Sequence, residues 1–258
     1  MKLALYQGPA TCGDIEAGFN RLQTRLSAAA MAGASMAVFS ELFLPGYNLP
    51  DLHRSLAQPL GGQWCQRLSD LAANAGCGLT VGWTELDGEN VYNAATAFGT
   101  RGEILGHYRK IQLFGPMEKA SFAFGERYTT FDFCGRKTAI LICYDIEFPQ
   151  HCRALADRGV SLVLVPTANP RRFEHVSHAF VPSRAAEAGL TIAYANYCGP
   201  EGDITFGGKS LIAGPDGKAL ASAGTGETLL VADLAPVSDI PWDLLSRQDQ
   251  DYREGKFQ

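Results

Sequence analysis

The sequence predicts a single α/β domain in which helices cover mixed β-sheets. Short apolar segments typical of buried strands alternate with amphipathic helical segments along the whole chain. Of the 258 residues, 46% are hydrophobic and 19% are charged, a balance that allows a large buried core. No linker, repeat or low-complexity block interrupts the alternation. We therefore expect one domain over residues 1–258, with the polar tail 246–258 able to form a C-terminal arm.

The first half of the chain begins with a strand and a helix. Lys2–Gln7 is an apolar strand, and Asp14 is suited to cap a helix whose apolar residues recur at helical spacing until Gly33. The turn sequence Gly99–Gly102 predicts a hairpin. The other elements expected here are the strands Met36–Phe39, Leu79–Trp83, Val91–Phe98 and Glu103–Arg109, a helix around 64–72, and an irregular stretch over 111–127.

The second half repeats the pattern and then becomes rich in strands, with a turn at Gly214–Gly217. Its expected elements are the strands Tyr128–Phe133, Lys137–Ile142, Val160–Val165 and Leu190–Ala195, a helix from Pro149 and a helix over Val176–Ala188. In α/β folds, ligands bind beyond the carboxyl ends of strands. Reactive side chains at strand ends are therefore the candidates for function.

Composition excludes several classes of protein. The 22 basic and 27 acidic residues give a net charge of 22 − 27 = −5, which argues against a nucleic-acid partner. No apolar run approaches the roughly 20 residues of a membrane span, and the start has no signal-peptide pattern. The seven cysteines form no C-x-x-C pair and are odd in number, so neither a zinc ribbon nor a disulfide framework fits. We expect a cytoplasmic protein with no membrane association.

Three reactive side chains follow apolar strands. Glu41 comes after Met36–Phe39, Lys110 ends the strand from Glu103, and Cys143 follows Ile142. Each alone is typical of an ordinary strand end, and a cysteine there is usually an inert packing residue. Together they are chemically coherent, because a carboxylate can take a thiol proton, an ammonium can stabilise an oxyanion, and a thiolate can attack a carbonyl carbon. The helix expected near Pro149 would further favour the thiolate.

The segments around these residues resemble a known family. SELFLPGY, YRKIQLFG and LICYDIEFP are similar, in the right order, to the three catalytic motifs of the nitrilase (carbon-nitrogen hydrolase) superfamily. The resemblance extends over essentially the whole chain, including VPTANP and GKSLIAGPDG. It implies a four-layer α-β-β-α sandwich, a homodimer or higher homo-oligomer, a small-molecule amide substrate, and a hydrolase that needs no metal or other cofactor.

The resemblance also implies a role for each residue. Glu41 would be the general base, Cys143 the nucleophile that forms a thioester, and Lys110 the oxyanion ligand together with the backbone N–H of Tyr144. The family uses a second glutamate after the lysine, and Glu118, eight residues beyond Lys110, matches it best.

The substrate is less constrained by the sequence. CYDIEFP, VPTANP and YANYCG resemble the 5-aminopentanamidase branch and related stereoselective amidases, which implies a small aliphatic primary amide, such as an ω-amino amide. The stretch Asp145–Glu147, soon after Cys143, contains no cation. Glu147, with Glu174, could therefore favour an amine-bearing substrate. Equally, Glu147 could pair with Arg171 or Arg172 and never meet substrate. The candidates for substrate contact are Glu147, Tyr47 and Asn169.

Several alternatives stay open at this point. The triad also fits N-carbamoylputrescine hydrolysis or nitrile hydrolysis, and the chain could be a binding subunit with a vestigial triad. A Cys-His hydrolase using His151 is disfavoured, because the expected helix would direct this histidine away from Cys143. His175 and His178 lack a third metal ligand, and Gly207–Ser210 lacks the first glycine of a phosphate loop. No G-x-S-x-G serine-hydrolase motif occurs.

Overall fold

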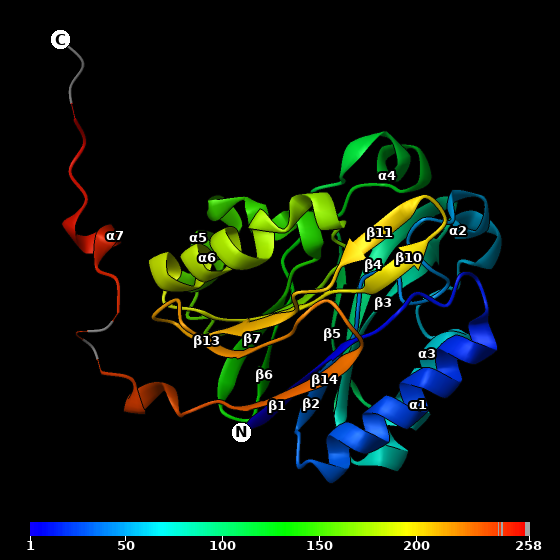
Figure 1. Ribbon diagram of the computed structural model, residues 1–258, viewed down its shortest axis with the longest axis horizontal. Coiled ribbons are helices and arrows are strands. Elements are labelled where there is room, and N and C mark those ends of the chain that lie inside the picture. Colours follow the sequence, from blue (N-terminus) through cyan, green and yellow to red (C-terminus); the bar gives the residue numbers. More distant parts are fainter. Residues whose placement is uncertain (242, 244, 256–258) are drawn as a thin grey trace.

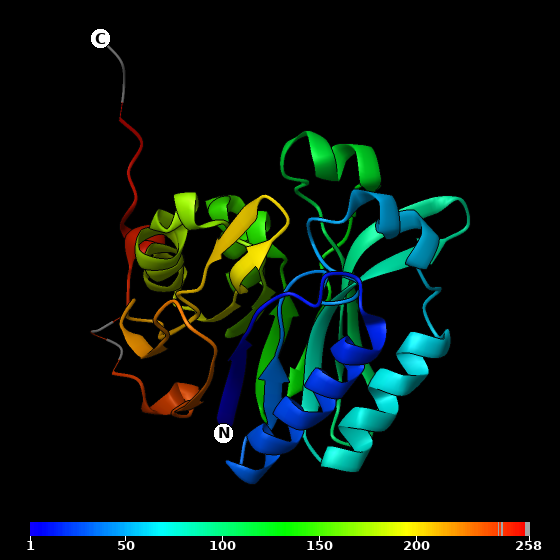
Figure 2. The same cartoon turned by 45° about the vertical axis from the view of Figure 1, so that its right-hand side comes forward.

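Two six-stranded sheets pack face to face between two layers of helices. This is a computed structural model, and it describes residues 1–241, 243 and 245–255. The views in Figures 1 and 2 show α1 and α3 outside one sheet and α5 and α6 outside the other. The expected α/β class and the α-β-β-α sandwich are confirmed.

The first sheet has the strand order β14-β1-β2-β3-β4-β5. β1, β2 and β3 are parallel at its centre, and the neighbouring pairs are antiparallel. The hairpin expected at Gly99–Gly102 is confirmed by the antiparallel pairing of β4 with β5. The bounds of these strands are β1 Lys2–Gln7, β2 Met36–Val38, β3 Gly78–Asp87, β4 Asn90–Phe98, β5 Ile104–Arg109 and β14 Thr228–Asp233.

The second sheet has the order β13-β12-β9-β8-β7-β6 and repeats the plan of the first. Its three central strands, β7, β8 and β9, are parallel, so reactive residues that follow them collect at one edge. The bounds are β6 Thr130–Phe133, β7 Arg136–Ile140, β8 Leu162–Pro166, β9 Thr191–Ala195, β12 Leu211–Ala213 and β13 Ala219–Ser222.

The outer helices form where the sequence supplies caps and an apolar face. The Asp14 side chain accepts a hydrogen bond from the Ala17 N–H at 2.9 Å and so caps α1. Gly76 ends α3 in the left-handed conformation, with a φ of 60°. The bounds of the covering helices are α1 Ile15–Met31, α3 Gln63–Ala75, α5 Pro149–Ala156 and α6 Val181–Ala188.

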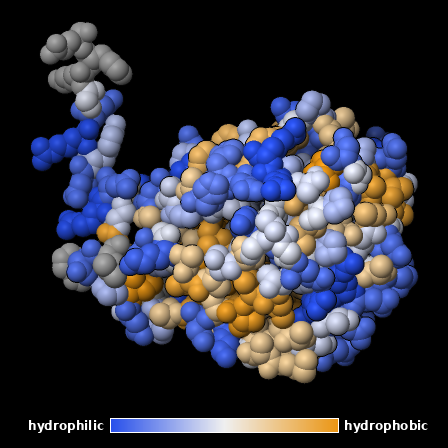
Figure 3. Space-filling view, viewed as in Figure 1, coloured by the Kyte–Doolittle hydropathy of each residue, from blue (hydrophilic) through white to orange (hydrophobic). Residues whose placement is uncertain are grey.

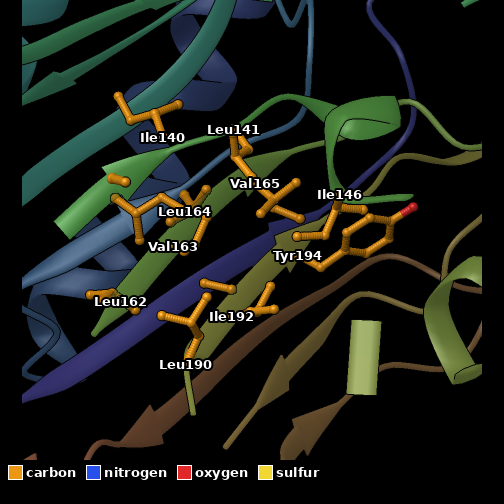
Figure 4. Packing of buried hydrophobic residues seen from close by; sticks show 14 of the residues in the cluster. Ile140, Leu141, Ile146, Leu162, Val163, Leu164, Val165, Leu190, Ile192 and Tyr194 are labelled. Atoms are coloured by element: carbon orange, nitrogen blue, oxygen red, sulfur yellow. The ribbon is translucent and has the colours of Figure 1, made fainter. Parts of the chain in front are cut away.

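The core lies between the two sheets. Figure 4 shows apolar side chains of the second sheet, among them Ile140, Leu164 and Ile192, packed together. Leu5 and Val38 of the first sheet belong to the same fully buried cluster. A second cluster fills the space between the first sheet and α1 and α3, with Phe19, Leu22 and Leu68 on the helices. Burial on both faces explains why the central strands are continuous apolar runs.

Short elements frame the end of the sandwich where the parallel strands finish. β10 (Cys198–Glu201) and β11 (Ile204–Gly207) form a separate antiparallel hairpin. The helix α4 (Gly115–Ser121) shows that the expectation of an irregular 111–127 stretch was wrong over these residues, since Gly115 and Pro116 begin a helix there. The other short elements are α2 Pro50–Leu56, a 3₁₀ turn at Cys143–Glu147, further 3₁₀ turns at Arg171–Phe173 and Val237–Asp239, a π-turn at Val176–Phe180, and α7 Gln248–Asp251.

The chain leaves the sandwich after β14. Residues 245–255 project from the body of the molecule in both ribbon views and form a hydrophilic extension in Figure 3. The tail predicted as an arm ends in residues 256–258, which lie outside the described residues. Within the described part of the chain, no helix has the length and apolar character needed to span a membrane.

Candidate active site

The three strand-end residues come from both sheets. Glu41 follows β2 and Lys110 follows β5 in the first sheet, whereas Cys143 follows β7 in the second. The two sheets approach closely here, because the backbone N–H of Glu41 donates to the carbonyl oxygen of Thr167, just beyond β8, at 3.4 Å. The packing of the sheets therefore assembles residues that are about 100 positions apart in sequence.

A buried ion cluster lies at the centre of this site. Lys110 Nζ is 2.6 Å from Glu41 Oε1 and 2.8 Å from Glu118 Oε1, and all three side chains are fully buried. Asn93 Nδ2 donates to Glu41 Oε1 at 2.7 Å, and Tyr47 Oη donates to Glu118 Oε1 at 2.7 Å. Glu41 Oε2 has no hydrogen-bond partner among the described residues, so one oxygen of this carboxylate is available to a reacting group.

The ionisation of the cluster follows from its burial and charge. Burial raises the pKa of Glu41, and Glu118 adds to this effect, while Lys110 and Asn93 oppose it. Burial acts to lower the pKa of Lys110, but the two carboxylates outweigh it and raise that pKa. Lys110 is therefore a permanent cation. A carboxylate with a raised pKa suits a group that must both take and give a proton near neutral pH.

Cys143 occupies a strained backbone position in the site. Its φ is 44°, in the left-handed region that non-glycine residues rarely adopt, and such strain is common at functional sites. Burial and Glu41 raise the pKa of its thiol well above the ordinary value, while Lys110 and a backbone hydrogen bond from Ala168 lower it. The expected helix does begin at Pro149, but a 3₁₀ turn separates it from Cys143 and burial favours the neutral thiol, so the expectation of a helix-stabilised thiolate was wrong. The resting thiol therefore needs a base.

Asp145 joins the cysteine turn to the lysine loop. Its fully buried carboxylate accepts hydrogen bonds from the backbone N–H of Ile142 at 2.9 Å and of Gln112 at 2.8 Å. Tyr108 Oη donates to it at 2.9 Å. Burial raises the pKa of Asp145 to about 6, against the opposing effect of the two backbone hydrogen bonds and of Lys110. The Asp145 carboxylate thus binds Tyr108 and Gln112, which lie on either side of Lys110 in sequence, and also Ile142, which directly precedes Cys143.

A small pocket opens onto the thiol. It encloses about 240 Å³ including its open mouth. Phe114 contacts Tyr144 and Phe173 edge-to-face, with ring centroids 5.1 Å and 5.6 Å apart. The residues lining the pocket are Tyr47, Phe114, Cys143, Tyr144, Glu147, Ala168, Asn169, Pro170 and Phe173. A larger hollow beside Arg109 and Tyr128 is lined by neither Cys143 nor the Glu41–Lys110–Glu118 cluster, so its size alone does not make it the active site.

The candidate substrate-contact residues all line this pocket, but they are not equally free. Tyr47 donates its hydroxyl to Glu118, and Asn169 Nδ2 donates to the Phe173 carbonyl oxygen at 2.9 Å, so both also hold parts of the site in place. Among the described residues, no ion pair joins the Glu147 carboxylate to Arg171 or Arg172. Burial raises the pKa of Glu147, opposed by His175, Lys110 and Arg184.

Two expectations about neighbouring residues are settled by the geometry. Glu174 was predicted to contribute to an acidic lining, but it lies outside the pocket lining and pairs with Arg171 at 3.6 Å. His151 interacts with Tyr128 and Gln112 rather than with Cys143. No cluster of three potential metal ligands exists within the described residues, His175 and His178 included.

Sequence reasoning missed several residues that shape the site. Asn93 was treated only as part of a strand, although a polar residue in the middle of the apolar run Val91–Phe98 is itself a signal. Asp145 lies inside the cysteine motif, yet only the contacts across 33 residues to Gln112 reveal its function. Phe114 and Phe173 reach the pocket from loops, and no periodicity marks them.

The fold and the site together define a hydrolase that acts on carbon–nitrogen bonds other than peptide bonds. The chain belongs to the carbon-nitrogen hydrolase family, whose model matches residues 2–242. It is 39% identical over 239 residues to a "Hydrolase in pqqF 5'region" of Pseudomonas protegens, covering 91% of this chain and 82% of that protein. It is 32% identical over 254 residues to an (R)-stereoselective amidase of a Pseudomonas species, covering 98% and 90%.

A solved structure has the same fold. The crystal structure of an amidase from a Nesterenkonia species superimposes with a TM-score of 0.87 at 36% identity, covering 95% of this chain and 94% of that one. Variants of that amidase have been solved with acrylamide and with butyramide, and acrylamide adds to its active-site cysteine. The Glu41–Lys110–Cys143 arrangement is consistent with these amidase structures.

Proposed function

We propose that this protein hydrolyses small aliphatic primary amides to a carboxylate and ammonia through a cysteine thioester. The observation that carries the proposal is the buried Glu41–Lys110–Glu118 cluster beside the strained Cys143 at the base of a small pocket. Such an arrangement combines a base, a fixed cation and a nucleophile, which are the three components that acyl transfer from an amide requires.

In the first half-reaction Glu41 takes the proton of the Cys143 thiol, and the sulfur attacks the amide carbon. Lys110 and the Tyr144 backbone N–H stabilise the oxyanion that develops on the carbonyl oxygen. The protonated Glu41 then gives its proton to the leaving nitrogen. Ammonia departs and the acyl group stays on sulfur as a thioester.

In the second half-reaction Glu41 removes a proton from a water molecule, which attacks the thioester carbon. The tetrahedral intermediate collapses, the carbon–sulfur bond breaks, and the thiolate takes the proton back from Glu41. Glu118 contributes by fixing Lys110, whose ammonium it shares with Glu41. Cys143 is again a thiol and Glu41 again a carboxylate, so the enzyme has neither gained nor lost a proton over the cycle.

The pocket supports a short acyl chain. With its open mouth left out, the pocket encloses only about 10 Å³, far below the roughly 300–1,000 Å³ of ordinary ligand pockets, so a substrate must be small and its lining must move apart to admit it. Aromatic rings from Phe114, Tyr144 and Phe173 make its walls apolar. A variant of the related Nesterenkonia amidase has been solved in complex with butyramide, a short aliphatic amide.

Within this class we propose ω-amino amides, such as 5-aminopentanamide, as the preferred substrates. Glu147 is the carboxylate that lines the pocket; Arg184 donates to its backbone carbonyl oxygen at 2.9 Å and, with His175 and Lys110, acts to lower its pKa. It would attract a terminal ammonium group and repel a terminal carboxylate. Aromatic faces beside it add a favourable environment for a cation.

Activity on an amide panel tests the reaction. We expect ammonia to be released from butyramide and 5-aminopentanamide by the wild-type protein, and Cys143→Ala to abolish release while its circular dichroism stays unchanged. Cys134→Ala is the matched control, since this exposed cysteine lies in the β6–β7 turn, at the opposite end of β7 from Cys143. Turnover by Cys143→Ala would overturn the proposal.

Replacing Glu147 tests the substrate class. Glu147→Gln should lower kcat/KM for 5-aminopentanamide by about tenfold, corresponding to about 1.4 kcal/mol, and leave butyramide within twofold. Glu174→Gln, on the neighbouring turn but outside the pocket, is the control. An equal effect of Glu147→Gln on both amides would contradict recognition of the amine.

Two other reactions of the family use the same residues. Release of ammonia together with carbon dioxide from N-carbamoylputrescine would favour the carbamoyl reaction. A nitrilase of Pyrococcus abyssi is 31% identical over 239 residues, so a nitrile arm belongs in the panel. Faster turnover of butyronitrile than of butyramide would make nitrile hydrolysis the function. The expected homodimer and single domain are testable by light scattering on the same preparation.

A further inference from the structure

The loop that carries Tyr47 is held by a carboxylate from a distant part of the chain. Glu201, at the end of β10, accepts hydrogen bonds through Oε2 from the backbone N–H of Tyr47 at 3.1 Å and of Asn48 at 2.7 Å. Only 1% of Glu201 is exposed, and no cation pairs with it among the described residues. Burying an ionisable side chain in this way destabilises the fold, and a functional role would explain why the residue is present.

The same loop is held from its other side by a histidine. Nε2 of His53 lies 3.1 Å from the Tyr47 carbonyl oxygen and 3.3 Å from that of Gly46, so it donates to this pair of acceptors. Burial lowers the pKa of His53, which favours the neutral ring. Gly46 has a φ of 142°, and a Cβ added there would lie 2.4 Å from Glu201 Oε1. The loop is therefore fitted closely around the Glu201 carboxylate.

Tyr47 connects this loop to the ion cluster. Its hydroxyl donates to Glu118 Oε1, the oxygen that also binds Lys110 Nζ. Phe206 of β11 meets the Tyr47 ring edge-to-face, with centroids 6.1 Å apart. The β10–β11 hairpin thus contacts Tyr47 at both its backbone and its ring, while the hydroxyl orients Glu118.

We propose that Glu201 is a positioning residue for the hydrolytic reaction, acting through Tyr47 on Glu118 and Lys110. The proposal rests on the proposed amidase function. Glu201 itself does not line the pocket around Cys143. Its hydrogen bonds to the loop set the position of the Tyr47 hydroxyl. This hydroxyl in turn orients the Glu118 carboxylate that binds the Lys110 ammonium.

A double-mutant cycle tests this chain of contacts with butyramide as substrate. Glu201→Ala and Tyr47→Phe should each lower kcat by at least tenfold, and the double variant should be no slower than Tyr47→Phe alone. Glu201→Gln should keep most of the wild-type kcat, because its amide oxygen can accept the same two N–H groups. The matched control is Asp203→Ala. Asp203 is an exposed acid on the same hairpin that accepts from Asn48 Nδ2 at 2.8 Å, and its loss should leave kcat within twofold.

Three results would overturn the proposal: multiplicative losses in the double variant, a Glu201→Gln variant as slow as Glu201→Ala, or a Glu201→Ala variant with unchanged kcat. If Glu201→Ala does not fold, Glu201→Asp replaces it, because its shorter side chain withdraws the carboxylate while keeping the charge. Failure of the amidase function itself is distinguishable, because wild-type protein would then release no ammonia. In that case the rate at which iodoacetamide alkylates Cys143 replaces kcat as the readout. Glu201→Ala and Tyr47→Phe should each change this rate, and the double variant should have the rate of Tyr47→Phe alone.

Discussion

Asp145 provides the sharpest test of how the site is held together. Asp145→Asn removes one of two acceptor oxygens, so the new NH₂ group must face either the Gln112 N–H or the Ile142 N–H and Tyr108 hydroxyl. A lost hydrogen bond to a charged acceptor costs about 1.5–3 kcal/mol. The pKa of Asp145 rises from 3.8 to about 6 as the net result of burial against its hydrogen bonds and Lys110, so the ionised form costs about 3 kcal/mol net, which asparagine avoids.

These two effects are similar in size and opposite in sign. We therefore expect Asp145→Asn to change the free energy of unfolding by less than about 2 kcal/mol, because the lost hydrogen bond offsets the avoided cost. Activity should respond differently, because displacement of the Gln112 or Ile142 backbone moves Lys110 relative to Cys143. A displacement of about 1 Å can cost about 100-fold in rate.

The assay compares kcat for butyramide with urea unfolding of the same samples at pH 7.5. The expected result is a loss of about 100-fold in kcat with a change of less than about 2 kcal/mol in the free energy of unfolding. Asp132→Asn, an exposed aspartate of β6, is the control and should alter neither. Asp145→Asn with kcat within twofold of wild type would refute the idea that this carboxylate aligns lysine and cysteine.

The remaining predictions concern stability and the base. Burial alone would raise the pKa of Glu85, but hydrogen bonds from His107 and Arg109 bring it down to about 2. Glu85 therefore adds about 3 kcal/mol to the free energy of unfolding above pH 4.5, and this contribution is lost as the pH falls toward 2. Glu85→Gln should flatten this acid dependence in urea unfolding, and an unchanged slope would contradict it. Asn93→Ala removes a hydrogen bond from Glu41 and should lower kcat about tenfold without raising KM. Leu164→Ala should cost about 2–5 kcal/mol by opening a cavity between the sheets, read as a lower urea midpoint.

Strand ends marked the three main residues as candidates, and the family resemblance gave them their expected roles. Glu41, Lys110 and Cys143 were predicted because each follows a buried apolar run, and the structure brings the strand ends of both sheets together. Glu118 was predicted from the family resemblance, as the match to the family's second glutamate, and it lies 2.8 Å from the lysine ammonium. Local sequence carries this information because the strands themselves fix where their carboxyl ends lie.

The contacts that hold the site could not be predicted in the same way. Glu201 meets the Tyr47 loop across 153 residues, and Asn93 meets Glu41 across 52, so neither partner is visible from spacing. The state of the Cys143 thiol was also misjudged, because the desolvation that raises its pKa depends on packing from both sheets. Tertiary burial, rather than local pattern, sets these properties.

The most direct test of the account is the identity of the covalent intermediate. Wild-type protein quenched in acid during turnover of butyramide, then digested and analysed by mass spectrometry, should carry a butyryl group on the peptide that contains Cys143. Cys143→Ala should carry none and release no ammonia. An acyl group on another residue, or ammonia release without Cys143, would contradict the mechanism.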